Sequence, residues 1–128
     1  MKLLLDTHLL LWAAGESERL SVQARDLISD KKNTLLYSAA SLWAITIKNG
    51  LGRDDFQIDV QLLRQGLIDN EYIELPITSK HAIAIDCLPP IHKDPFDRIL
   101  VAQTIIEGIT LLTTDSLVAQ YHGSVKKV

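Results

Sequence analysis

The chain carries the stretch His92-Lys93-Asp94-Pro95-Phe96-Asp97-Arg98, followed directly by Ile99-Leu100-Val101-Ala102-Gln103. Pro95 suits the first position of a helix, because the N–H that it lacks would be unsatisfied there in any residue. Asp94 as N-cap and Asp97 three residues later approximate a capping box and complement the positive end of the helix dipole. A divalent cation is the second interpretation, because Mg²⁺ takes one or two protein carboxylates and adds water and phosphate oxygens. This stretch alone favours capping, unless further acids meet at the same place.

Length and composition describe an ordinary folded protein. The 128 residues predict a single domain, residues 1–128, and the hydrophobic share of 47% is typical of a soluble protein. A net charge of −3 and a pI near 5.7 argue against a broad basic surface for duplex nucleic acid. The lone Cys87 excludes an internal disulfide and is expected to be a small buried hydrophobe. We expect a cytoplasmic protein without a membrane span, because Asp6 to His8 interrupt the apolar N-terminus.

Short apolar runs alternate with helical patterns along the chain. We expect strands at 2–5, 34–37, 72–77, 109–113 and 125–128. We expect helices at 7–14, 22–30, 39–49, 58–69, 80–86 and 95–107, and a further helical turn or two at 116–121, with Ser21, Ser38 and Ser79 as N-caps. The 39–49 helix is apolar almost all round and should be buried, and Leu62 should face the core. The alternation predicts an α/β fold with a mostly parallel sheet of about five strands, flanked by helices on both faces.

Four acids are expected to meet at one edge of this sheet. Asp6 and Asp115 each follow an apolar strand, and Asp94 and Asp97 open a helix at the same edge. In such sheets, functional sites lie in the crevice at the carboxyl ends of the strands. Each acid is also a good N-cap, and capping is the commoner role of such residues. Capping alone would leave a concentrated negative cleft without a purpose.

Four blocks of sequence occur in a recognisable order. They are Leu5-Asp6-Thr7-His8 with Leu10-Leu11-Trp12, Ser41-Leu42-Trp43 with Ile47-Lys48, the stretch His92–Arg98, and Thr113-Thr114-Asp115. Together they resemble the PIN-domain family, and within it the VapC-type toxins of bacterial toxin–antitoxin pairs. The resemblance covers the chain from Leu3 to about Asp115. It implies a three-layer α/β sandwich, a Mg²⁺- or Mn²⁺-dependent endoribonuclease, a homodimer, and neutralisation by a small antitoxin protein.

The resemblance also assigns the site residues. It implies that Asp6, Asp97 and Asp115 hold the metal ion, and that Asp94 is an additional catalytic acid of this subgroup. Asp94 would ligate the metal directly, orient a bound water or support the start of the helix. Ala44 stands directly after the tryptophan of the 39–49 helix, where similar toxins have a glutamate. Alanine is the best helix former, so the absence of the glutamate removes a carboxylate without weakening the helix. Whether natural or introduced, this alanine predicts weaker metal binding and a sharp fall in turnover.

Cationic side chains would be needed to hold an RNA substrate. Arg98 and Lys48 are the expected phosphate contacts, whereas Lys93 and Arg53 are at least as consistent with solvated surface charge. His92 could also donate to a phosphate, although a loop histidine without a role is the safer interpretation. An antitoxin arginine would compete with the metal by pairing bidentately with one of the acids.

Two other functions stay open. The first is a catalytically dead PIN scaffold that binds only an antitoxin or RNA. Ala44 favours this alternative, and the retained Asp6, Asp97 and Asp115 count against it. The second is a receiver-like domain phosphorylated on aspartate, which shares an acidic pocket at strand ends. Such a domain needs an acidic pair at the first strand and a lysine after the last one, and neither stands in the right place.

Overall fold

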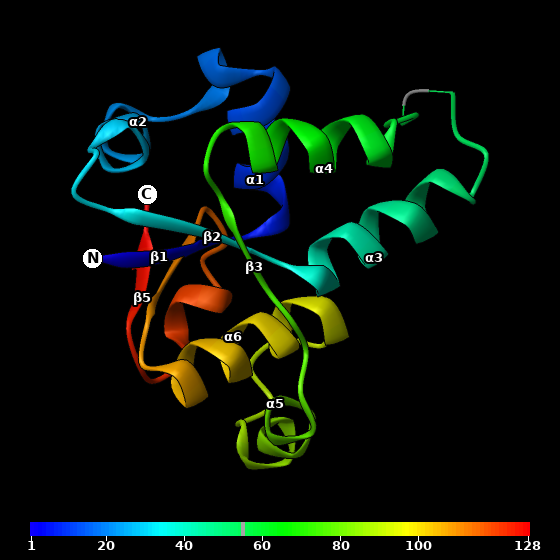
Figure 1. The fold of residues 1–128 in the computed structure, drawn as a ribbon. Coiled ribbons are helices and arrows are strands. Elements are labelled where there is room, and N and C mark those ends of the chain that lie inside the picture. The colour runs from blue at the N-terminus through cyan, green and yellow to red at the C-terminus, as the bar shows by residue number, and fades with distance from the viewer. Residues whose placement is uncertain (55) are drawn as a thin grey trace.

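A parallel sheet forms the centre of the protein (Figure 1). The structure is a computed structural model and describes residues 1–54 and 56–128. In this part of the chain, five strands lie in the order β3-β2-β1-β4-β5, and all neighbouring pairs are parallel. The strands are β1 (Lys2–Leu5), β2 (Thr34–Ser38), β3 (Ile73–Leu75), β4 (Thr110–Thr113) and β5 (Val125–Lys127). The predicted sheet is therefore confirmed, and it is parallel throughout.

Helices cover both faces of the sheet and complete the predicted three-layer α/β sandwich. One side carries α1 (Thr7–Gly15), α2 (Val22–Ser29) and α4 (Val60–Asp69), and the other carries α5 (Ser79–Ala84) and α6 (Pro95–Glu107) (Figure 1). Helix α3 (Ala39–Asn49) continues from the end of β2, and short 3₁₀ turns span Ser17–Arg19, Ile85–Cys87 and Val118–Gln120. Among the described residues, no helix has both the length and the apolar character needed to cross a membrane.

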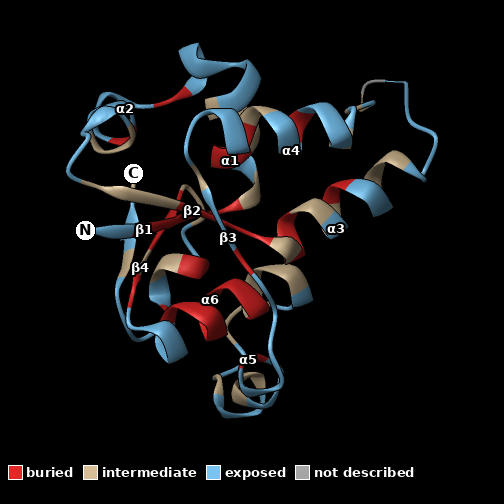
Figure 2. Ribbon diagram, in the orientation of Figure 1, coloured by how far each residue is buried: buried red, intermediate tan, exposed pale blue. Residues whose placement is uncertain are grey.

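The central strand β1 divides the core into two layers. Leu3 and Leu5 belong to the apolar cluster that includes Leu9 and Leu10 of α1, whereas Leu4 belongs to the other cluster. This division follows from the alternation of side chains along a strand. All three leucines of β1 are fully buried, as expected for a parallel strand with helices on both faces. Figure 2 shows that α6, beneath the sheet, is buried along much of its length.

Helix α6 begins and ends at the predicted residues. Asp94 is its N-cap, and the Asp94 Oδ1 atom accepts the N–H groups of Phe96 at 2.8 Å and of Asp97 at 3.4 Å. Pro95 occupies the first helical position. Gly108 ends the helix with a φ of +65°, in the left-handed region that glycine adopts without a steric penalty. The start of this helix is thus fixed by the residues that also carry the candidate chemistry.

Some predictions of burial are wrong. Trp43 and Ile47 of α3 are 60% and 45% exposed, because the core covers only one face of this helix. Leu62 of α4 is 70% exposed, because the helix turns the adjacent Leu63 toward the core. Cys87 is also exposed, since it lies in a surface turn after α5. Apolar composition alone does not indicate which face of a helix packs against the core.

Helix α5 is capped by Thr78 rather than by Ser79. The Thr78 hydroxyl accepts the His81 N–H, and the Nδ1 atom of His81 accepts the Thr78 N–H at 3.0 Å, which completes a capping box. His81 is fully buried, and its Nε2 atom lies 2.8 Å from Oε2 of Glu107. This contact joins α5 to the carboxyl end of α6.

Candidate active site

Asp6 lies at the carboxyl end of β1 and caps α1. Its Oδ1 atom accepts the Leu9 N–H at 2.9 Å, and its Oδ2 atom accepts the hydroxyl of Thr113 at 2.6 Å. The residue is only 6% exposed. Burial raises the pKa of the Asp6 carboxyl, although the hydrogen bonds from Thr113 and Leu9 oppose this shift. The hydrogen bonds hold Asp6 in one position at the end of the central strand.

The two carboxylates at the start of α6 have different surroundings. Asp94 is exposed, whereas the side chain of Asp97 is only 24% exposed. Burial, followed by the negative charge of Asp94, raises the pKa of Asp97 to about 6. The charges of Asp6 and Asp115 act in the same direction. Asp97 therefore lies where additional positive charge, such as that of a cation, would be favourable.

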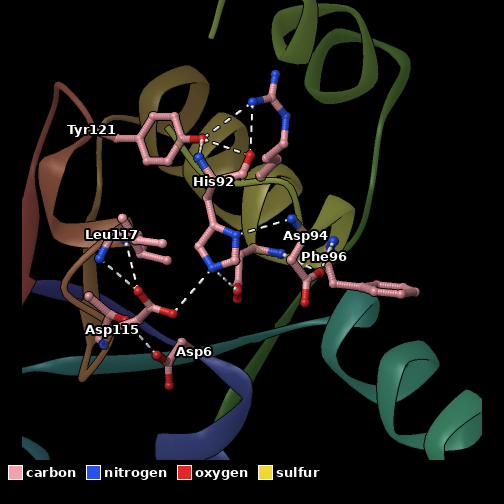
Figure 3. Close-up of polar contacts among 11 residues, drawn as sticks. Asp6, His92, Asp94, Phe96, Asp115, Leu117 and Tyr121 are labelled. Carbon is pink, nitrogen blue, oxygen red and sulfur yellow. Dashed lines mark hydrogen bonds and ion pairs between the residues drawn. The ribbon is translucent and has the colours of Figure 1, made fainter. Parts of the chain in front are cut away.

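Asp115 lies just beyond the end of β4 and begins a turn. Its Oδ1 atom accepts the N–H groups of Leu117 at 2.7 Å and of Val118 at 3.2 Å. Partial burial works against ionisation, but the N–H groups of Val118 and Leu117, together with His92, lower the pKa of the Asp115 carboxyl. Asp115 is therefore readily ionised, and its Oδ2 atom faces His92 (Figure 3).

The hydroxyl of Thr113 connects the ends of β1 and β4. It donates to Asp6 at 2.6 Å and accepts the main-chain N–H of Asp115 at 3.0 Å. Leu5 pairs with Leu112 in the sheet, so the two strand ends lie side by side. This role of Thr113 is indicated in the sequence only by its position at the end of a strand, two residues before Asp115.

His92, for which the sequence indicated a loop histidine without a role or a phosphate donor, lies among the acids. Its Nε2 atom is 3.2 Å from Oδ2 of Asp97 and 3.2 Å from Oδ2 of Asp115. Its Nδ1 atom accepts the main-chain N–H of Asp94 at 3.0 Å. The Tyr121 hydroxyl accepts the main-chain N–H of His92 at 2.8 Å (Figure 3). The close spacing of one histidine and two aspartates was the signal in the sequence.

The predicted acids line a single cavity of about 350 Å³. Its wall includes the four aspartates Asp6, Asp94, Asp97 and Asp115, and also His92. The same wall includes two residues of α3, one helical turn apart, which are Ala44 and Lys48. The cavity therefore gathers every predicted acid and the alanine that replaces the expected glutamate. A carboxylate at this position would join the same cluster.

The predicted phosphate contacts differ in their positions. Lys48 lines the cavity, and its Nζ atom lies 4.4 Å from the centroid of the Phe56 ring. Arg98 instead donates to the carbonyls of Ile85 and His92 at 3.2 and 3.3 Å, and to the Tyr121 hydroxyl at 3.3 Å. The guanidinium of Arg98 therefore supports the loop before α6. Lys48 has the better position for a ligand in the cavity.

The donor groups of this cavity fit a divalent cation. Carboxylate oxygens of Asp97 and Asp115 lie within 4.8 Å of each other and of a ring nitrogen of His92. Asp6 lines the same cavity, and each of its oxygens already accepts one hydrogen bond. Carboxylate oxygens are the ligands that Mg²⁺ and Mn²⁺ prefer in proteins. The raised pKa of Asp97 agrees with a cluster of negative charge that a cation would stabilise.

Comparisons with known proteins cover nearly the whole chain. The family model for the PIN domain matches residues 3–123, which include all four acids. The fold is similar to a chain in the crystal structure of VapBC2 from Rickettsia felis bound to a DNA fragment from their promoter. The two chains are 13% identical, with a TM-score of 0.71, and the match covers 100% of this chain and 99% of the other. No curated protein matches the sequence.

Proposed function

This chain belongs to the PIN domain family, and we propose that it is a metal-dependent endoribonuclease toxin of a toxin–antitoxin pair. The observation that carries this proposal is the convergence of Asp6, Asp97 and Asp115 on one cavity, with the pKa of Asp97 raised to about 6. A partly buried acidic cluster of this kind is stabilised by divalent cations. Phosphodiester hydrolysis is the chemistry that such cations support.

Three aspartates of this chain would bind the cation and hold it in position. Asp97 and Asp115 would hold Mg²⁺ or Mn²⁺, together with Asp6 at the end of β1. When bound, the cation lowers the pKa of a water and stabilises the charge that develops on the phosphate. Asp6 is held by Leu9 and Thr113, so it needs little rearrangement for this role. Asp94 keeps the start of α6 in place by capping it.

Lys48 is the proposed phosphate contact. It lies on the cavity wall, and it is one turn from Ala44 on α3. A cationic side chain beside a metal site would bind the RNA backbone without reading its sequence. Arg98 is a weaker candidate for this role, because its guanidinium already donates to the loop before α6.

Ala44 makes this chain a weak member of the proposed enzyme class. It places a methyl group on the cavity wall, at the position where the resemblance implies a carboxylate. One negatively charged ligand fewer should weaken the binding of the cation and slow the reaction. The helix itself is undisturbed, since alanine suits the interior of α3.

The proposed partners are an antitoxin protein and a second copy of this chain in a cytoplasmic homodimer. The similar crystal structure is described as a VapBC2 complex, which supports an antitoxin partner. Trp43, Ile47 and Leu62 are exposed apolar side chains of the kind that protein interfaces cover. An arginine of the antitoxin would compete with the cation by pairing bidentately with Asp97.

RNA cleavage by this chain and by its Ala44→Glu variant tests the proposal. Structured RNAs are incubated with each protein and Mg²⁺ or Mn²⁺, with and without a chelator. Glutamate should raise the rate at least about tenfold, because groups that merely support metal ligands already contribute about 10- to 100-fold. Ala44→Gln is the matched control, with a similar shape and no charge. Failure of a folded, metal-binding Ala44→Glu protein to cut any RNA would refute the catalytic proposal.

A catalytically dead PIN scaffold is the second candidate, and Ala44 on the cavity wall is the observation that favours it. This alternative predicts that RNA or antitoxin binds equally well to the parent chain and to Ala44→Glu, without cleavage by either. Chelators should then leave binding unchanged. Membership of the PIN family removes the receiver-like alternative.

A further inference from the structure

His92 contributes an imidazole that the proposed mechanism does not use. Its Nε2 atom lies 3.2 Å from carboxylate oxygens of both Asp97 and Asp115. The side chain is only 16% exposed, so water competes little for these contacts. The position is ambiguous by distance alone, because it would suit either a metal ligand or a hydrogen-bond donor. The hydrogen bond that the other ring nitrogen makes decides between the two roles.

The main chain of Asp94 determines which ring nitrogen carries the hydrogen. Its N–H points to Nδ1 of His92 at 3.0 Å, and an N–H group can only donate. Nδ1 must therefore accept and carry no hydrogen. The neutral ring then carries its hydrogen on Nε2, the atom that faces Asp97 and Asp115. In this tautomer Nε2 has no lone pair for a metal ion.

The loop that carries His92 is held by contacts that do not involve its imidazole. The Tyr121 hydroxyl accepts the main-chain N–H of His92 at 2.8 Å. Arg98 donates to the main-chain carbonyl of His92 at 3.3 Å and to the Tyr121 hydroxyl at 3.3 Å. These contacts fix the main chain from which the ring extends toward the acids (Figure 3).

We propose that His92 is an internal donor that competes with the cation, and that it is not a metal ligand. Its Nε2–H donates to Oδ2 of Asp115 and lies 3.2 Å from Oδ2 of Asp97. An ion held by these two carboxylates must therefore displace it. His92 therefore does not replace the carboxylate missing at Ala44. The inference deepens the proposed function and rests on it for the identity of the cation site.

The tautomer of His92 is the first test. Long-range ¹H–¹⁵N spectra of the labelled protein, assigned with the His92→Gln variant, should show a proton on Nε2 and none on Nδ1. Addition of Mg²⁺ should shift this resonance, because the carboxylate contact is lost, and should leave the proton on Nε2. A proton on Nδ1, or loss of the Nε2 proton with Mg²⁺, would overturn the proposal.

The affinity for Mn²⁺ is the second test, measured by calorimetry on the folded protein. His92→Ala should bind Mn²⁺ about two- to tenfold more tightly than the parent, because one hydrogen bond no longer competes with the ion. His92→Gln retains an N–H donor and should bind less tightly than His92→Ala. His122→Gln removes an exposed histidine outside the cavity and should match the parent.

The outcomes separate this inference from the proposed function. Weaker Mn²⁺ binding by His92→Ala would identify a ligand and overturn the inference, while the metal site itself would stand. Absence of Mn²⁺ binding to both the parent and Ala44→Glu would refute the proposed function. In that case the tautomer measured without metal still decides whether His92 is a donor.

Discussion

Replacement of Asp97 by asparagine should stabilise the protein in the presence of a chelator, although it removes a proposed metal ligand. Asparagine has nearly the same shape as aspartate and keeps the main-chain contact of position 97 with Asp94. It lacks the negative charge that burial and Asp94 make unfavourable at this position. The folded chain bears the cost of ionising Asp97, and the unfolded chain does not.

The pKa of Asp97 gives the magnitude. The value rises from 3.8 to about 6, and each pKa unit corresponds to about 1.4 kcal/mol between the two protonation states. The upper bound is therefore about 3 kcal/mol, and partial exposure of the side chain reduces the expected gain to about 2 kcal/mol. Because its pKa is raised, folded Asp97 binds more protons than unfolded Asp97 between about pH 4 and about pH 6. The stability of the parent should therefore fall as the pH rises through this range.

Urea unfolding of the parent and of Asp97→Asn, with chelator, measures this difference. The free energies of unfolding should agree within a few tenths of a kcal/mol near pH 4, and the variant should gain its full advantage above about pH 7. Asp26→Asn, which removes an exposed carboxylate of α2, is the control and should show no such divergence. Excess Mg²⁺ should then stabilise the parent more than Asp97→Asn.

Equal stabilities at every pH, or a less stable Asp97→Asn protein at pH 8, would refute the reasoning. Either result would mean that hydrogen bonds already compensate the ionised Asp97. The carboxylates of the cluster would then be stable without a bound cation.

Three further substitutions test the contacts around the site. Thr113→Val removes the hydroxyl that donates to Asp6 and should cost about 1.5–3 kcal/mol in urea unfolding, because the acceptor is a carboxylate. Tyr121→Phe leaves the His92 main-chain N–H without this acceptor and should cost about 1–3 kcal/mol, with faster hydrogen exchange at His92. Gly108→Ala places a Cβ at a φ of +65° and should lower stability by about 1 kcal/mol, with no effect on Mn²⁺ binding.

Local sequence signals predicted the boundaries of α6 and the convergence of the acids. The proline, the capping aspartate and the terminal glycine define α6 through interactions with the nearby main chain. Asp6 and Asp115 could be placed together because parallel strands end at the same edge of a sheet. Local chemistry and topology were sufficient for these features, and no knowledge of side-chain packing was needed.

The features that were missed depend on distant neighbours. Apolar composition predicted that α3 is buried, but the packed structure leaves Trp43 and Ile47 largely exposed, although Trp43 contacts the Phe96 ring of α6. The charge of Arg98 suggests a phosphate contact, and only the fold shows that its guanidinium also donates to the carbonyls of His92 and Ile85. The proximity of His92 to Asp97 could be read from their spacing, but its contact with Asp115, 23 residues away, depends on the fold. Contacts between residues far apart in the chain leave no periodic pattern in a single sequence.

The acids of this site also serve as caps, which affects how such a protein can evolve. Asp6, Asp94 and Asp115 each accept main-chain N–H groups at the start of a helix or turn. Asparagine caps helices about as well as aspartate, so mutation can remove a charge and keep the local fold. Ala44 likewise carries no charge and suits the interior of α3, so the helix is kept without a carboxylate there. A lineage of this fold can therefore drift from enzyme to inert binding protein, or regain activity, while its scaffold stays foldable.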